Sequence, residues 1–253
     1  MSIHSSLQWF ARVVWYDIFV SALSLVMPRL CPICKTPIAR GYKYICPRCL
    51  LDSPTTGFET ELENKMAERV KSLSPYIEEA SSLIYYIKGS CWVALIHEMK
   101  YSGYANHAER LGEWLGYVLR GSELYSQVDV VIAIPLHPLR HMARGYNQSD
   151  LIARGCAKSM GVESLHGVVR RRRLNRPQVK IDRNARWDNV EDLFRVNNVE
   201  RLRGRNILLV DDVFTTGATI LSCADEIHNV VPDCRIWIAT VAVAYGELGV
   251  ESR

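Results

Sequence analysis

The segment Ile207–Leu221, ILLVDDVFTTGATIL, decides the fold class of this chain. It opens with a continuous apolar run, which is typical of a strand buried on both faces in a parallel sheet. The run ends in two adjacent carboxylates, Asp211 and Asp212, and the chain then turns through Thr-Thr-Gly into a helix expected over Gly217–Val230. Ligands of such sheets bind at the carboxyl ends of the strands, so the acids and the turn are candidate binding residues.

The turn after the two acids has the chemistry of an anion site. Gly217 permits a backbone geometry that other residues rarely adopt, so that successive N–H groups can converge on one anion. The start of the next helix adds a positive partial charge and free N–H donors. A phosphate at this turn and a diol at the carboxylates describe a ribose 5-phosphate, and the acids could also help to hold Mg2+. The candidate phosphate residues are Thr215, Thr216, Gly217, Ala218 and Thr219.

Strand and helix patterns alternate through the rest of the C-terminal part. Apolar runs predict strands at Ser82–Ile87, Asp129–Ile134, Asn206–Val210 and Ile236–Ala244, and apolar spacing predicts helices at Cys91–Met99, Ala108–Leu119 and Asn147–Met160. This alternation implies right-handed crossovers and a mainly parallel sheet with helices on both faces, an α/β fold.

The N-terminal segment Leu7–Met27 is apolar but carries Gln8, Arg12 and Asp17. Two charges near the middle of a membrane span would cost about 2.5–3.5 kcal/mol each. The segment also lacks the basic start and the small-residue cleavage site of a signal peptide. We therefore expect an amphipathic helix over 1–27 and no transmembrane segment, with weak peripheral membrane contact as the alternative.

Four of the eight cysteines form two CxxC pairs, Cys31 with Cys34 and Cys46 with Cys49, separated by eleven residues. This spacing is typical of a zinc ribbon, in which two tight turns present four thiolates to one metal. Because four ligands leave no open position, we expect one structural Zn2+; iron, or thiols that act in redox chemistry, are the alternatives. The other four cysteines are single and lie in apolar surroundings, which suits a reducing, cytoplasmic location.

A basic run lies between the two halves of the α/β pattern. It contains Arg170, Arg171, Arg172, Arg173, Arg176, Lys180, Arg183 and Arg186 against one acid, Asp182. The net charge of the chain is only +4, so its overall charge does not by itself indicate a nucleic-acid partner. The run can be a solvated face, a loop that closes over an anionic substrate, or a contact for nucleic-acid phosphate.

Four stretches together resemble the ComF competence-protein family, which includes the GntX-like proteins, within the type I phosphoribosyltransferase superfamily. They are the double CxxC, IPLHPLRHMARGYNQSDLIA (134–153), the region 170–194 that begins RRRRLNRPQ, and VDDVFTTGAT (210–219). The last resembles the motif by which type I phosphoribosyltransferases bind 5-phosphoribosyl-1-pyrophosphate (PRPP). One departure concerns residues 174–177, Leu-Asn-Arg-Pro, where the family usually has a threonine.

The resemblance implies a type I phosphoribosyltransferase fold that binds PRPP with Mg2+. We accordingly divide the chain into the helix 1–27, the zinc-ribbon-like module 28–53, a connector 54–75 and a phosphoribosyltransferase-type domain 76–253. The resemblance implies catalytic roles for Asp211, Asp212, Arg183 and Arg186, and a PRPP site completed on its pyrophosphate side by Pro135, Leu136, His137, Arg140 and Arg144. His137 can instead be a solvated side chain, and Asn147 and Gln148 either face the site or cap the next helix.

Three functions remain open at this stage. The first is a phosphoribosyltransferase, a pentosyl-transferring glycosyltransferase, whose acceptor the sequence does not reveal. The second is a DNA-handling protein of natural transformation that acts without turnover, with single-stranded DNA and the competence machinery as partners and Arg170, Arg171, Arg172 and Arg173 as DNA contacts. The third is a structural adaptor that docks through its zinc module, which leaves the two acids and the threonine turn without a purpose.

Overall fold

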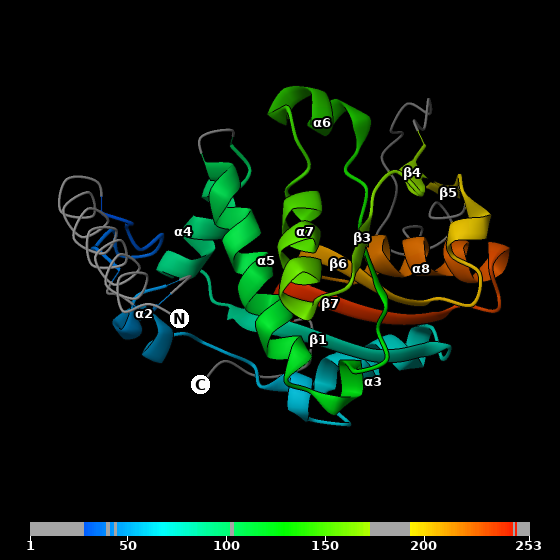
Figure 1. Cartoon of the computed structure of the whole chain (residues 1–253), viewed down its shortest axis with the longest axis horizontal. Helices are drawn as coiled ribbons and strands as arrows, with labels where there is room; N and C mark the ends of the chain where they lie inside the picture. Colours follow the sequence, from blue (N-terminus) through cyan, green and yellow to red (C-terminus); the bar gives the residue numbers. More distant parts are fainter. Residues whose placement is uncertain are drawn as a thin grey trace, which may run out of the picture. The chain divides into compact units, whose positions relative to one another are not determined.

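The computed structural model describes residues 28–38, 41–42, 45–101, 104–172, 193–244 and 246 (Figure 1). The helix expected over 1–27 lies outside this range, as do five residues of the basic run, Arg173, Arg176, Lys180, Arg183 and Arg186. The chain forms two compact units, Met1–Asp52 and Ser53–Arg253. The first contains the cysteine pairs and a short helix, α2 (Pro47–Leu51), which begins after Cys46.

The second unit is built on a five-stranded parallel sheet. Its strands lie in the order β1 (Ile77–Tyr86), β7 (Arg235–Ala244), β6 (Asn206–Phe214), β2 (Val130–Ala133) and β3 (Glu163–Leu165). The expected fold class, a mainly parallel α/β sheet with a small four-cysteine module, is therefore confirmed. The central strand β6 runs four residues farther than predicted, through both acids to Phe214.

Helices cover both faces of this sheet, which explains why the central strands are continuously apolar. On one face lie α5 (Ala105–Arg120) and α7 (Gln148–Met160), and on the other lie α3 (Lys65–Leu73) and α8 (Ala218–Val230) (Figure 1). Ile207 and Leu209 of β6 pack in one buried cluster with residues of α3 and α8. Leu208 and Val210 alternate with them and are also fully buried, as expected for a strand with two covered faces.

The segment expected as a connector contributes to this core. Helix α3 buries Met66, Ala67 and Val70 beneath β1. Its N-cap, Asn64, is buried, accepts a hydrogen bond from the N–H of Ala67 and donates to the backbone oxygens of Phe58, Glu61 and Ala80. Residues 54–75 are thus tied to the sheet by both apolar packing and hydrogen bonds.

Smaller elements follow the strands near their carboxyl ends. They are α4 (Cys91–Glu98) after β1, α6 (Pro138–Arg144) after β2, and the antiparallel hairpin of β4 (Val169–Arg171) and β5 (Phe194–Val196). Single turns of 3-10 helix occur at η1 (Phe58–Thr60), η3 (Glu123–Tyr125) and η5 (Val199–Arg201). The resemblance implies a loop at Pro135–Arg140 on the pyrophosphate side, but residues 138–140 belong to helix α6.

A seam of glycines joins α5 to α7. Gly112 and Gly116 on α5 approach the α7 backbone at Ile152 and Cys156, and Gly155 on α7 approaches the α5 backbone at Glu109. A Cβ atom on Gly112 would lie 2.1 Å from the backbone oxygen of Ile152, and one on Gly155 would lie 2.1 Å from that of Glu109. Because these obstacles are backbone atoms, glycine is required for the helices to approach this closely. The seam sets the position of α7, and α7 begins at the candidate site.

Candidate functional site

The two acids at the end of β6 are both held by the first turn of α7. The Ser149 hydroxyl donates to Asp211 Oδ1 over 2.7 Å, and the Gln148 amide Nε2 lies 3.1 Å from Asp212 Oδ2. Each acid also accepts a backbone N–H: that of Asp212 reaches Asp211 Oδ1, and that of Val213 reaches Asp212 Oδ1. Their oxygens are thereby oriented by fixed donors before any ligand arrives.

The electrostatics of the pair follow from its burial. Burial of the Asp211 carboxyl raises its pKa to about 7, and the neighbouring charge of Asp212 adds to the rise, whereas the Ser149 hydrogen bond and the charge of Arg171 act in the opposite direction. Two adjacent carboxylates in partial burial repel one another. A cation or a pair of hydroxyl donors would relieve that repulsion, which is the chemistry expected of a sugar–metal site.

The turn that follows has the predicted geometry at its glycine. Gly217 has a φ of 82°, in the left-handed region, and forms the N-terminal boundary of α8 without a side-chain cap. A Cβ at this position would lie 2.6 Å from the Phe214 ring, so a larger residue is excluded by space as well as by backbone geometry. Thr215 and Thr216 are exposed, and Ala218 and Thr219 are half-buried at the start of the helix. The Ala218 N–H donates to the Thr216 hydroxyl over 3.4 Å. The N-terminal turn of α8 can receive an anion, which would replace this long hydrogen bond.

The predicted pyrophosphate side is partly helical, because α6 begins at Pro138. His137 caps α6, because its Nδ1 accepts the N–H of Leu139, and Arg140 lies exposed on that helix. Arg144, at the last turn of α6, donates to Gln148 Oε1 over 3.0 Å. Gln148 thus connects a cation of α6 to the acid Asp212. Pro135 and Leu136 lie half-buried in the intervening loop.

Of the two polar residues at the start of α7, Asn147 caps the helix and Gln148 faces the site. Asn147 is the helix cap: its Oδ1 accepts the N–H of Ser149, and its Nδ2 donates to the Ile134 oxygen. Gln148 instead faces the acids. The turn before them is fixed by Tyr146, whose hydroxyl donates to the backbone oxygens of Met99 and Tyr101.

The described arginines of the basic run lie in different environments. Arg170 and Arg172 are exposed on β4 and just after it, whereas Arg171 is half-buried with its guanidinium 5.6 Å from the centre of the Phe194 ring. The charge of Arg171 acts on Asp211, so this arginine lies in the electrostatic field of the acids. The run is therefore not a uniform solvated face within its described part.

Three features of the site carried no recognisable sequence signal. Ser149 is a common helix-start residue, and its pairing with Asp211 depends on how α7 packs. The inward position of Arg171 depends on strand alternation in a short hairpin that has few apolar residues. Helix α6 has no buried residue, so it lacks the apolar periodicity that reveals a helix. Only the proline after His137 indicated a helix start there.

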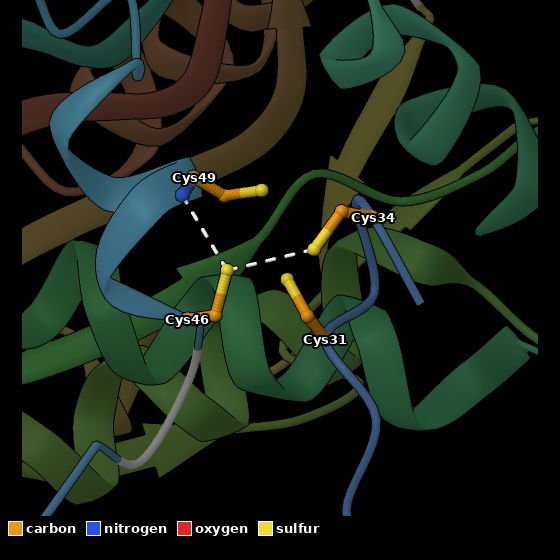
Figure 2. A group of neighbouring side chains, drawn as sticks. All are labelled: Cys31, Cys34, Cys46 and Cys49. Carbon is orange, nitrogen blue, oxygen red and sulfur yellow. Dashed lines mark hydrogen bonds between the residues drawn. The ribbon is translucent and has the colours of Figure 1, made fainter. Parts of the chain in front are cut away.

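The cysteine module brings its four thiols together (Figure 2). The sulfurs of Cys31, Cys34, Cys46 and Cys49 all lie within 4.8 Å of one another. Two turns produce this arrangement: the N–H of Cys31 donates to the Thr36 oxygen, and the N–H of Cys49 donates to the Cys46 sulfur at the start of α2. Three of the four side chains are buried, and Cys34 is exposed.

The four sulfurs fit a tetrahedral metal ion. Zn–S bonds of about 2.3 Å place sulfurs about 3.8 Å apart around one ion, and the observed spacing needs little adjustment to reach that value. The Thr36 hydroxyl lies 2.9 Å from the Cys34 sulfur, and the hydrogen bonds from Thr36 lower the pKa of Cys34 to about 6. Burial raises the pKa of Cys49, so a metal must displace a proton there. These residues can hold one metal ion with four thiolates.

Several curated bacterial proteins are similar to this chain in sequence. The chain is homologous over most of its length to bacterial proteins named for DNA utilization, and over 43% of its length to a protein named for competence, which together confirm the resemblance to the ComF family. "DNA utilization protein YhgH" of Shigella flexneri, and that of Escherichia coli K12, are each 26% identical over 224 residues, which cover 84% of this chain and 97% of the relative. "Competence protein F" of Haemophilus influenzae is 27% identical over 111 residues, covering 43% of this chain and 48% of the relative. No family model matches the chain.

The solved structures that match part of the chain include two enzymes whose names refer to phosphoribosyl compounds. Adenine phosphoribosyltransferase of Saccharomyces cerevisiae is 13% identical, with a TM-score of 0.37 over 61% of this chain and 77% of the enzyme. Glutamine PRPP amidotransferase of B. subtilis is 18% identical, with a TM-score of 0.36 over 53% of this chain and 26% of the enzyme. Among the residues that the structure describes, no helix has the length and apolarity needed to cross a membrane.

Proposed function

We propose that this chain binds PRPP, with Mg2+, at the carboxyl ends of β2 and β6. The observation that carries the proposal is the pair Asp211 and Asp212, oriented by the start of α7 and followed at once by the Gly217 turn. Only four residues separate Asp212 from Gly217 in the sequence, which supports a single site for the diol and the phosphate of one ribose.

The 5-phosphate of PRPP would contact the open N–H groups and hydroxyls of Thr215–Thr219. The ribose hydroxyls would donate to Asp211 and Asp212, and bound Mg2+ would neutralise charge on the acids and the diphosphate. The diphosphate would lie toward Pro135–Arg140 and Arg144, where charge-assisted hydrogen bonds from arginine suit it. Arg183 and Arg186, by their resemblance to the catalytic loop of related enzymes, would cover it.

Transfer from this arrangement needs no covalent enzyme intermediate. The bond between the anomeric carbon and the diphosphate oxygen breaks, and the diphosphate leaves with the bonding electrons. The positive charge that develops on the ribose is stabilised by the nearby carboxylates. An acceptor then forms the new bond at the anomeric carbon and loses a proton. We propose the chain as a phosphoribosyltransferase whose acceptor is unassigned.

A charge-neutralising double change, Asp211→Asn with Asp212→Asn, tests the proposal. We expect PRPP affinity in the presence of Mg2+ to fall at least a hundredfold by calorimetry, because both the hydroxyl acceptors and the cation site lose charge. Glu200→Gln, on the exposed turn η5, is a matched control that should leave affinity unchanged. Unchanged affinity in the double variant would remove the proposal.

A second candidate function follows from the names of the relatives and from the exposed arginines. We propose a role in the use of DNA in the cytoplasm, with single-stranded DNA contacting the exposed residues Arg170 and Arg172 at the hairpin. Phosphate contacts of this kind weaken steeply with salt. A filter-binding titration at rising salt, run beside a pyrophosphate-release assay against bases and amines, separates binding from turnover. The zinc module, with a structural Zn2+ on four cysteines, would then serve as a rigid contact surface for DNA or a competence protein.

A further inference from the structure

A second cavity lies beside the proposed PRPP site. It has a volume of about 600 Å3 and is enclosed by the loop after β2, helix α6, the start of α7 and the segment that joins β3 to β4. Its described lining does not include the two acids or the threonine turn, and it shares Pro135 and Leu136 with the predicted pyrophosphate side. The volume falls within the range of about 300–1,000 Å3 that is usual for small-molecule pockets. This cavity can therefore hold a ligand of its own.

One wall of the cavity carries a half-buried cation, Arg171. Val169, Arg170 and Arg171, the three residues of β4, all line the cavity. The Nε atom of Arg171 is buried and has no hydrogen-bond partner among the described residues. Arg140 is close enough for its charge to oppose that of Arg171. A half-buried guanidinium next to like charges favours an anionic ligand group, such as a phosphate.

The described lining contains one carboxylate, Asp150, in the first turn of α7. Burial raises the pKa of Asp150, and the charges of His141 and His166 and the hydrogen bond of Asn147 oppose the rise. An ionised carboxylate only accepts hydrogen bonds, so its ligand must present donors. Guanine offers two adjacent N–H donors on one edge, a match for the two oxygens of a carboxylate.

The rest of the lining is largely apolar and suits a flat ring. The loop after β2 contributes Pro135 and Leu136, helix α6 contributes Pro138 and Met142, and β3 contributes Leu165. Small-molecule sites commonly combine such walls with a few polar groups that fix orientation. The lining therefore combines a cation, which suits a phosphate, a carboxylate, which suits the N–H edge of a base, and apolar surface, which suits the flat ring.

We propose that this cavity binds a guanine nucleotide, with its base edge at Asp150 and its phosphate at Arg171. The ligand can be a free nucleoside monophosphate or the terminal nucleotide of a DNA strand, because both present the same groups. The site is separate from the acid pair of the proposed PRPP site. A nucleotide in this cavity would lie beside the proposed PRPP site. It could bind whether or not PRPP is bound.

Two ligands and two variants test the proposal by calorimetry. The ligands are GMP and PRPP with Mg2+, and the variants are Asp150→Asn and the double variant Asp211→Asn with Asp212→Asn. We expect Asp150→Asn to weaken GMP binding about tenfold or more, the scale of a lost bidentate base contact, and to leave PRPP binding within about twofold. The double variant should show the reverse pattern. Failure of PRPP binding in every protein would remove the proposed function and leave the GMP result readable.

His141→Ala guards against a folding defect in the first variant. His141 is exposed and lines the cavity, so its removal should not disturb the core and should weaken GMP binding by a smaller factor. Arg195→Met, on the exposed face of β5, is the control for nonspecific charge loss, because Arg195 does not belong to the described lining. No GMP binding at millimolar concentration, or GMP binding lost only in the double acid variant, overturns the proposal.

Competition then identifies the source of the nucleotide. A linear strand with a 5′-phosphorylated terminal dG and a circular single strand without ends are each added to the GMP complex. Displacement by the linear strand alone supports a strand end, and displacement by neither supports a free nucleotide. Displacement by the circular strand with the same affinity as the linear one would show that an end is not recognised, which contradicts the proposal.

Discussion

The cysteine module and the α/β domain are stabilised by different forces. In the described part of the module, residues 28–38, 41–42 and 45–52, the buried apolar side chains are Pro32, Ile45 and three of the four clustered cysteines. The domain, in contrast, has central strands whose side chains are buried on both faces. Because the module buries so little apolar surface, hydrophobic burial alone does not offset the conformational entropy of ordering it. The domain is therefore stabilised by packing, whereas we expect the module to depend on a metal ion held by its four cysteines.

Removal of metal should separate the two regions most strongly. Structural zinc contributes about 10–16 kcal/mol in small zinc-binding peptides, so chelation or Cys34→Ser should loosen residues 28–52 completely and leave the domain folded. Hydrogen exchange read by mass spectrometry would localise the change, and metal analysis should find one zinc per chain. Cys91→Ser, another exposed cysteine change, is the matched control. A reduced, zinc-free protein with a protected module would contradict this picture.

A substitution in the glycine seam should destabilise the α/β domain and leave the cysteine module intact. Gly112→Ala places a Cβ against the backbone oxygen of Ile152, so α5 and α7 must separate. We expect a loss of about 3 kcal/mol in the free energy of unfolding of the domain, with zinc content unchanged. Gly121→Ala is the control, because its Cβ would meet nothing closer than 3.4 Å. Urea unfolding measures both. Equal stability of the two variants would show that the seam can open without cost.

The smallest effect concerns one hydrogen bond within the site. The pKa of Asp211 is raised from 3.8 to about 7 in the folded chain, so ionising this group opposes folding, and stability should fall as pH rises from about 4 to about 7. Ser149→Ala removes a donor to the ionised form and should cost about 1–2 kcal/mol at pH 8 and less at pH 5. Urea unfolding at the two pH values tests this. Asp211→Asn should abolish the difference, and an equal cost of Ser149→Ala at both pH values would contradict the assigned hydrogen bond.

Sequence reasoning found the parts of the molecule that have local signals. The apolar runs around Asp129–Ile134 and Asn206–Val210 predicted two adjacent strands, and the CxxC spacing predicted the thiol cluster. Contacts between distant segments had no such signal. The bond from Ser149 to Asp211 depends on the packing of α7, which in turn depends on the glycine seam. Spacing in the sequence gives no information on whether two helices approach closely, so these features became visible only in the folded structure.

The shared support of Asp211 and Asp212 has a thermodynamic consequence. Ser149 and Gln148 are consecutive residues, so one displacement of the start of α7 alters the environment of both acids together. A ligand that draws Asp212 away from Gln148 would thereby change the free energy of binding at Asp211. Such linkage is reciprocal: each ligand alters the affinity for the other by the same factor. Sugar and cation would in that case bind cooperatively, through a single turn of helix rather than through direct contact.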